Sequence, residues 1–200
     1  MSEVFNIIDY VGTVVFAITG ASIAASIKFD FFGMLFLAFL TAVGGGTVRD
    51  LIISEPVFWT QDPIYLYLIF VATFSTFFLK SFYEKQSSLL YFLDTLGVAT
   101  FVVIGTQKTL LLDFNQETAF IMGTISAVLG GILRSAFSGE FSILSNRELY
   151  ATLAAAASLL FIVLSAAEVN LNLSASVTII FTFVIRHLAT KFGIKLPTAK

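Results

Sequence analysis

The chain of 200 residues is 58% hydrophobic and only 12% charged, with a mean hydropathy of +0.94. A soluble domain carries about 25% charged residues, so this composition excludes a soluble fold and indicates an integral membrane protein. The absence of cysteine excludes disulfides and thiolate metal sites, and the single histidine, His187, excludes histidine-rich metal sites. A net charge of −2, with no basic cluster before the C-terminus, argues against nucleic acid as a partner.

Seven apolar runs follow one another along the chain, each near the length of about 20 residues that crosses a bilayer. Polar breaks separate them, and too few residues remain for a domain outside the membrane. The acidic start, with Glu3 and Asp9, predicts that the first run is a retained helix and not a cleaved signal peptide. We therefore expect an all-α integral membrane protein, with residues 1–200 as a single transmembrane domain and spans at about 10–27, 33–53, 64–82, 89–107, 119–137, 149–167 and 173–190.

The loops between these spans predict the orientation of the chain. If the N-terminus lies outside, the outer side holds only Arg49 and Lys108, and the other nine cations lie inside: Lys28, Lys80, Lys85, Arg134, Arg147, Arg186, Lys191, Lys195 and Lys200. The positive-inside rule then places the C-terminus in the cytoplasm. We expect the protein in the inner (cytoplasmic) membrane. We expect the basic tail 191–200 to contact anionic membrane lipids.

Other residues near the span ends are expected to have no function. The aromatic residues there are typical of a membrane interface: Trp59, Tyr65, Tyr67, Tyr83 and Tyr91. Lys108, Asp113 and Glu117 are expected in a solvated outer loop. No P-loop, dinucleotide fingerprint or H-E-x-x-H motif occurs, so we expect no catalytic residue, no enzymatic activity, no metal and no cofactor.

A motif recurs at an offset of 85 residues. The pattern D-x-x-G-x-x-x-F-x-x-x-G occupies 9–20 and again 94–105, and the same offset aligns Glu55 with Glu140 and Tyr65 with Tyr150. Each copy contains three spans, so the second copy enters the membrane from the opposite side. We expect a 3+3 inverted repeat, about 9–84 and 94–168, with a seventh span outside it, which is typical of transporters and some channels.

Glycine runs interrupt the second and fifth spans at matched positions. Gly44, Gly45 and Gly46, and then Gly130 and Gly131, each follow about eleven apolar residues, or about 16 Å of helix, which reaches the midplane. Consecutive glycines disfavour helix by about 1 kcal/mol each, so we expect both spans to be broken there, with freed carbonyls facing an ion pathway. The alternative is that the glycines allow close helix packing.

Arg49 and Arg134 follow the two glycine runs, at a depth where a charge costs about 2.5–3.5 kcal/mol on insertion scales. Asp50 can pair with Arg49, but its counterpart is Ser135, so Asp9 and Asp94 are the acids left to pair with either arginine. These charges either line the pathway or lock crossed helices. Phe16 and Phe101, matched in the repeat, either narrow a pore or pack between helices. The predicted pathway residues are therefore Asp9, Phe16, Gly44, Gly45, Gly46, Arg49, Asp50, Asp94, Phe101, Gly130, Gly131, Arg134 and Ser135.

The paired glycine runs followed by arginine, the two Asp-led motifs, the seven spans and the 3+3+1 repeat together resemble the trimeric intracellular cation (TRIC) channel family in its prokaryotic form. The resemblance covers nearly the whole chain. It implies a homotrimer with a separate pathway in each protomer, and conduction of monovalent cations, chiefly K⁺ with Na⁺ as a second ion. Related bacterial proteins with the same glycine pattern are assigned to glycine uptake.

Two functions therefore remain open. In a K⁺-permeable channel, Arg49 and Arg134 would repel cations and would act as gate or latch elements. In a secondary transporter of a small zwitterion such as glycine, the positive helix end at Thr47 and the Arg49 guanidinium would hold a carboxylate. A purely structural anchor fits poorly, because charges within the membrane cost free energy and an anchor has no use for them.

Overall fold

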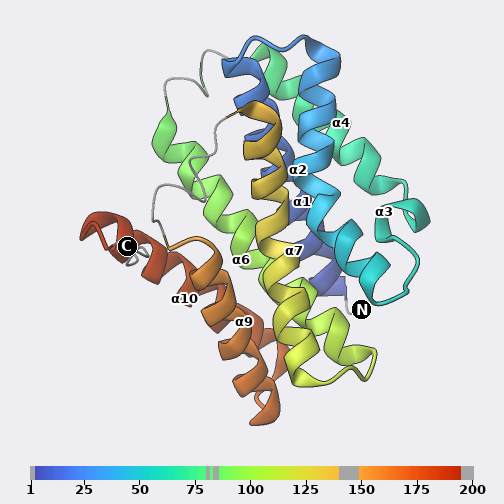
Figure 1. Cartoon of the computed structure of the whole chain (residues 1–200), viewed down its shortest axis with the longest axis vertical. Coiled ribbons are helices and arrows are strands. Elements are labelled where there is room, and N and C mark those ends of the chain that lie inside the picture. The colour runs from blue at the N-terminus through green and yellow to red at the C-terminus, as the bar shows by residue number, and fades with distance from the viewer. Residues whose placement is uncertain (1–2, 80–81, 83–85, 140–148, 195–200) are drawn as a thin grey trace.

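The computed structural model describes residues 3–79, 82, 86–139 and 149–194, and almost all of them are helical (Figure 1). The all-α class expected from the sequence is confirmed, and no strand occurs in the described ranges. Eight helices are described: α1 Glu3–Ser26, α2 Phe31–Ile52, α3 Phe58–Gln61, α4 Ile64–Phe78, α6 Ser87–Leu111, α7 Gln116–Ser138, α9 Ala151–Ala166 and α10 Leu171–Lys191.

Seven of these helices correspond to the seven expected spans. Five of them, α1, α2, α6, α7 and α10, are long and apolar enough to cross a membrane. The other two are shorter than expected, with 15 residues in α4 and 16 in α9, or about 22–24 Å of helix rise. Both stand third in their repeat. The structure also extends α1 back to Glu3 and adds the four-residue α3, neither of which the hydropathy pattern predicts.

Polar residues between the apolar runs fix where the helices begin. Asp30, Asn115 and Asn170 are the N-caps of α2, α7 and α10, and their side-chain oxygens accept hydrogen bonds from backbone N–H groups of the first turn. Gly139 ends α7 with a φ of 75°, which a residue with a side chain rarely adopts. Each N-cap contributes about 1 kcal/mol, so the breaks seen in the sequence are also local stop and start signals.

The two repeats meet where α2 crosses α7, and the contact has two-fold symmetry. A methyl group added at Gly45 would overlap the backbone carbonyl of Ser126, and one added at Gly130 would overlap that of Thr41. Ser126 and Gly130 are the counterparts of Thr41 and Gly45 at the offset of 85 residues. Gly45, the later of the two residues on α2, meets Ser126, the earlier of the two on α7. The two helices therefore run antiparallel, as an inverted repeat requires.

The same symmetry relates α1 and α6. Gly12 lies against Phe101, and its counterpart Gly97 lies against Phe16. The rings of Phe16 and Phe101 meet with their centroids 5.2 Å apart, and only 1% and 2% of these residues is exposed. Of the two roles considered for these phenylalanines, packing between helices is the one present in this structure.

The expected breaks at the glycine runs are absent: α2 continues as α-helix through Gly44, Gly45 and Gly46, and α7 continues through Gly130 and Gly131. The prediction of freed carbonyls at the midplane is therefore wrong for this state of the protein. Close approach of two helix backbones offsets the low helix propensity of glycine. An unsatisfied backbone group in hydrocarbon costs several kcal/mol, so keeping the helical hydrogen bonds is favourable.

The seventh span lies outside the repeat in space as well as in sequence. α10 packs beside α9 and α6, at the edge of the bundle opposite α4 (Figure 1). Side chains of α10 therefore reach the second repeat. This contact is one reason why the two groups of charged residues described below differ.

Candidate functional site

Charged side chains that are buried or partly buried gather in two groups. The Asp50 cluster consists of Arg49, Asp50 and Lys108, and the Asp94 cluster consists of Asp94, Arg134 and Arg186. Arg49 and Arg134 each lie about six residues, or about 9 Å of helix rise, beyond the centre of the α2–α7 crossing. Because these helices are antiparallel, the two clusters lie on opposite sides of the crossing.

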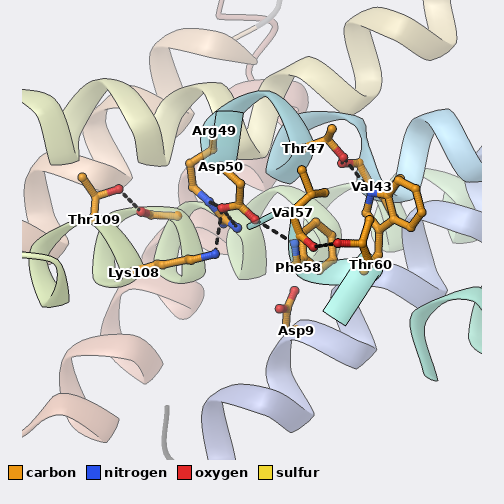
Figure 2. A network of polar contacts seen from close by, with 12 residues as sticks. Asp9, Val43, Thr47, Arg49, Asp50, Val57, Phe58, Thr60, Lys108 and Thr109 are labelled. Atoms are coloured by element: carbon orange, nitrogen blue, oxygen red, sulfur yellow. Dashed lines mark hydrogen bonds and ion pairs between the residues drawn. The ribbon is translucent and has the colours of Figure 1, made fainter. Parts of the chain in front are cut away.

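In the Asp50 cluster two cations share one carboxylate (Figure 2). Arg49 Nη2 and Nε and Lys108 Nζ all lie 2.8 Å from Asp50 Oδ1, while Oδ2 accepts a hydrogen bond of 3.0 Å from the backbone N–H of Phe58. The Asp50 side chain is fully buried, whereas that of Lys108 is 20% exposed. The cluster thereby joins α2, α3 and α6, and Lys108 is its most accessible member.

Asp9 lies on α1 and points toward the Asp50 cluster (Figure 2). Its Oδ2 accepts a hydrogen bond of 2.7 Å from Tyr65 Oη, and only 6% of the residue is exposed. No cation lies within ion-pair distance of Asp9 in the part of the chain that the structure describes. Together with Asp9, this end of the site holds two cationic and two carboxyl side chains.

In the Asp94 cluster each carboxylate oxygen meets its own guanidinium. Arg134 Nη2 lies 2.6 Å from Asp94 Oδ1, and Arg186 Nη2 lies 2.8 Å from Oδ2. Arg134 Nη1 also donates to Thr19 Oγ1 at 2.7 Å. Two guanidinium groups and one carboxylate leave one positive charge in excess, because arginine keeps its proton in proteins.

Two buried polar atoms of this region, Arg186 Nη1 and Tyr150 Oη, have no hydrogen-bond partner among the residues that the structure describes. The Arg186 guanidinium carbon lies over two aromatic rings, 4.7 Å from the ring centroid of Tyr91 and 5.1 Å from that of Tyr150. Buried donors normally find an acceptor, and an excess positive charge favours an anionic one. This end of the site therefore suits a carboxylate better than the Asp50 cluster does.

The repeat explains why the two clusters differ. Arg49 and Arg134 are counterparts, but Asp50 is replaced by Ser135, a buried residue without charge. Arg134 therefore pairs with Asp94, one of the two acids considered for it, whereas Arg49 pairs with its neighbour Asp50. Of the other predicted pathway residues, Phe16 lies against Gly130 at the helix crossing.

Four side chains assigned above to loops or interfaces lie in or beside the clusters instead. Lys108 pairs with Asp50, Tyr65 bonds to Asp9, and Arg186 and Tyr91 lie at Asp94. Two features of the sequence could have indicated that Tyr65 and Arg186 lie within the protein. Tyr65 matches Tyr150 in the repeat, and position 186 falls inside the expected seventh span.

The remaining loop and interface residues follow expectation where they are described. Tyr67 is 69% exposed, and Lys28, Asp113 and Glu117 are exposed. Trp59 is half-buried, and its Nε1 donates to Thr47 Oγ1 at 3.0 Å. Several residues used above lie outside the described residues: Lys80, Tyr83, Lys85, Glu140, Arg147, Lys195 and Lys200.

The profile of the family described as Glycine transporter matches residues 6–81 and 91–166. The chain belongs to this family. The two matched segments are offset by 85 residues, so the profile recognises each repeat separately. Among curated relatives, the UPF0126 inner membrane protein YadS of Escherichia coli K12 is 35% identical over 96% of this chain and 94% of its own length. A UPF0126 membrane protein of Vibrio cholerae is 34% identical over 98% and 83%.

Solved structures confirm the resemblance to the TRIC family. The TRIC trimeric intracellular cation channel orthologue from Rhodobacter sphaeroides is 31% identical and covers 96% of this chain and 100% of its own, with a TM-score of 0.92. A second structure, described under the structural basis for conductance through TRIC cation channels, is 31% identical over 98% of both chains, with a TM-score of 0.89. Both likenesses extend over the whole fold and not over one repeat alone.

Proposed function

We propose that this member of the family is a cation channel permeable to K⁺ and, as a second ion, Na⁺, with one pathway in each protomer of a homotrimer. It lies in the inner membrane with its N-terminus outside. The observation that carries the proposal is the full-length likeness to solved TRIC cation channels. The two charge clusters on either side of the α2–α7 crossing support it, because they put carboxylates near both ends of one route.

In this proposal the pathway is closed in the described state. At one end Lys108 and Arg49 occupy Asp50, and at the other end two arginines occupy Asp94. A permeant cation gains from either carboxylate only after its protein partner has moved away. The arginines therefore act as latches that keep the pathway closed, and not as ion ligands. Between them, the α2–α7 crossing at the glycines is the hydrophobic barrier.

Single-channel recording on the purified protein in a planar bilayer tests the proposal. We expect a conductance whose reversal potential follows the K⁺ gradient and not the Cl⁻ gradient, and replacing K⁺ by Na⁺ measures selectivity between them. Absence of cation-selective current at every voltage would exclude the channel.

A second candidate, secondary transport of glycine, is favoured by one specific feature. The Asp94 cluster offers a substrate carboxylate an excess positive charge and a donor, Arg186 Nη1, that has no partner among the described residues. The sequence predicts that Arg49 holds the substrate carboxylate, but in the structure Arg49 already donates to Asp50. Radiolabelled glycine uptake into proteoliposomes, saturable and competed by unlabelled glycine, together with no K⁺ current, would decide for the transporter.

A further inference from the structure

The short helix α3 lies on the half of α2 that follows the glycine run. A methyl group added at Gly46 would overlap the Phe58 ring, so this ring occupies the space that the missing side chain leaves. Beside it, Trp59 Nε1 donates to Thr47 Oγ1 at 3.0 Å. The third glycine of the run therefore receives α3, whereas the second receives α7.

The same docking holds one oxygen of Asp50 (Figure 2). Oδ1 of this carboxylate meets Arg49 and Lys108, whereas Oδ2 accepts the backbone N–H of Phe58 at 3.0 Å. The Phe58 ring centroid also lies 5.9 Å from the guanidinium carbon of Arg49. Release of α3 would remove the partner of Oδ2 and uncover it. An ionised carboxylate oxygen without a partner attracts water or a cation.

The helix α3 is small enough to leave its seat without disturbing the bundle. Of its four residues, Phe58 and Trp59 are half-buried and the other two are exposed. Its far end is held to α1, because Tyr10 Oη donates to Asp62 Oδ2 at 2.7 Å. Segments with few buried contacts open most readily, so α3 can part from α2 while this end stays attached.

The second repeat has a matching seat and places its aromatic ring on a long helix. Gly131, the counterpart of Gly46, lies against the Tyr150 hydroxyl, and the Arg186 guanidinium carbon is 5.1 Å from that ring. Tyr150 is the N-cap of the 16-residue α9, so its ring stays with that helix. Among the described residues, only the first repeat carries the seated ring on a separate short helix.

We propose that α3 is a lid over Asp50 at the outer end of the pathway, and that Phe58 is the residue that positions this carboxylate. When α3 is docked, its backbone N–H holds Oδ2 and its rings cover the carboxylate. When α3 is released, Oδ2 is free to attract a permeant cation. The gating role rests on the proposed channel, but the docking of α3 on Gly46 does not.

The fluorescence of Trp59 tests the docking, because it is the single tryptophan of the chain. We expect Phe58→Ala, which removes the seated ring, and Gly46→Leu, which fills the seat, to release α3. In both variants the emission should shift to longer wavelength, and acrylamide should quench it more strongly than in the wild type. Phe32→Ala is the matched control: this phenylalanine is 74% exposed at the other end of α2, and its loss should change neither signal.

Single-channel recording of the same variants tests the gate. Phe58→Ala and Gly46→Leu should raise the open probability for K⁺, because Asp50 Oδ2 is uncovered. A purely structural role of these residues predicts the opposite sign, a loss of current together with a lower melting temperature. Phe32→Ala should conduct like the wild type.

Two results would overturn the proposal. Unchanged quenching in both variants would show that α3 is not held by this seat, and stronger quenching without a rise in current would show that α3 is no gate. Absence of current in the wild type and in every variant would instead reject the channel, and the gate that rests on it. The quenching would still decide whether α3 docks on Gly46, so the two failures are distinguishable.

Discussion

Arg186 on α10 donates to Asp94 on α6 at 2.8 Å, so a helix outside the inverted repeat completes an ion pair inside it. Among the described residues the first repeat has no equivalent helix, and there Lys108 from α6 takes the corresponding place beside Asp50. Each cluster thus holds one carboxylate and two cations, and the Asp50 end has a further buried carboxyl, Asp9, beside it. We expect this difference to give the two ends different functions.

Gly45 is predicted to be far more sensitive to substitution than Gly44. A methyl group at Gly45 would overlap the backbone of Ser126, which cannot move freely, whereas one at Gly44 would meet only the end of the flexible Leu133 side chain. We expect Gly45→Ala to lower the stability by about 1–3 kcal/mol through overpacking, measured as a lower melting temperature in detergent.

Gly44→Ala is the matched control, and it should be neutral or slightly stabilising because alanine favours helix. Gly130→Ala should behave like Gly45→Ala, since the two glycines make the same contact in opposite repeats. Equal melting temperatures for Gly44→Ala and Gly45→Ala would show that α2 and α7 pack less closely at Gly45 than in this structure.

Much of this fold could be predicted from the sequence. Hydropathy can be read from each segment alone, and the repeat offset is found by comparing the sequence with itself. The offset of 85 residues already implied that Gly45 and Gly130 are equivalent. It could not reveal whether a glycine unwinds a helix or receives another helix, since both use the missing side chain. That choice depends on the partner at the crossing, Ser126 or Thr41, and this is a tertiary contact.

The charge clusters were only half predictable for a similar reason. Arg49 and Asp50 are neighbours in the chain, so their pairing could be expected. Lys108 and Arg186 come from the ends of other helices, where the positive-inside rule assigns lysine and arginine to the surface. Only the arrangement of α6 and α10 in space brings them to Asp50 and Asp94.

Tyr65 is predicted to stabilise the buried Asp9 carboxyl. Tyr65→Phe removes the hydrogen bond of 2.7 Å to Asp9 and leaves that carboxyl without a hydrogen-bond partner among the described residues, which costs about 1–3 kcal/mol. Thermal unfolding in detergent measures the loss. Tyr67→Phe is the control, because Tyr67 is 69% exposed, and it should leave the melting temperature unchanged.

The orientation can be tested by labelling, because the chain contains no cysteine. We expect Asp113→Cys, in the loop between α6 and α7, to react with a membrane-impermeant maleimide added to intact cells. Lys28→Cys, in the loop between α1 and α2, should react only after the membrane is permeabilised. Both positions are exposed, so a reversed pattern would place the N-terminus in the cytoplasm.

Lys108 is predicted to control access of cations to Asp50. Lys108→Met removes one of the two cations at Asp50 and leaves the Arg49–Asp50 pair intact, so the protein should remain folded with a small change in melting temperature. With one positive charge fewer at this end, K⁺ current at a given voltage should rise severalfold, and single-channel recording should show a higher open probability or a larger unitary conductance.

Arg134→Gln and Arg186→Gln provide the complementary comparison at the other end. Each leaves Asp94 with one guanidinium and removes the excess positive charge, so a channel should again conduct more. A transporter that uses Arg186 Nη1 for a carboxylate should lose glycine uptake in Arg186→Gln, whereas Lys108→Met should retain it. Unchanged current in all three variants, with unchanged uptake, would mean that these ion pairs lock helices and take no part in the pathway.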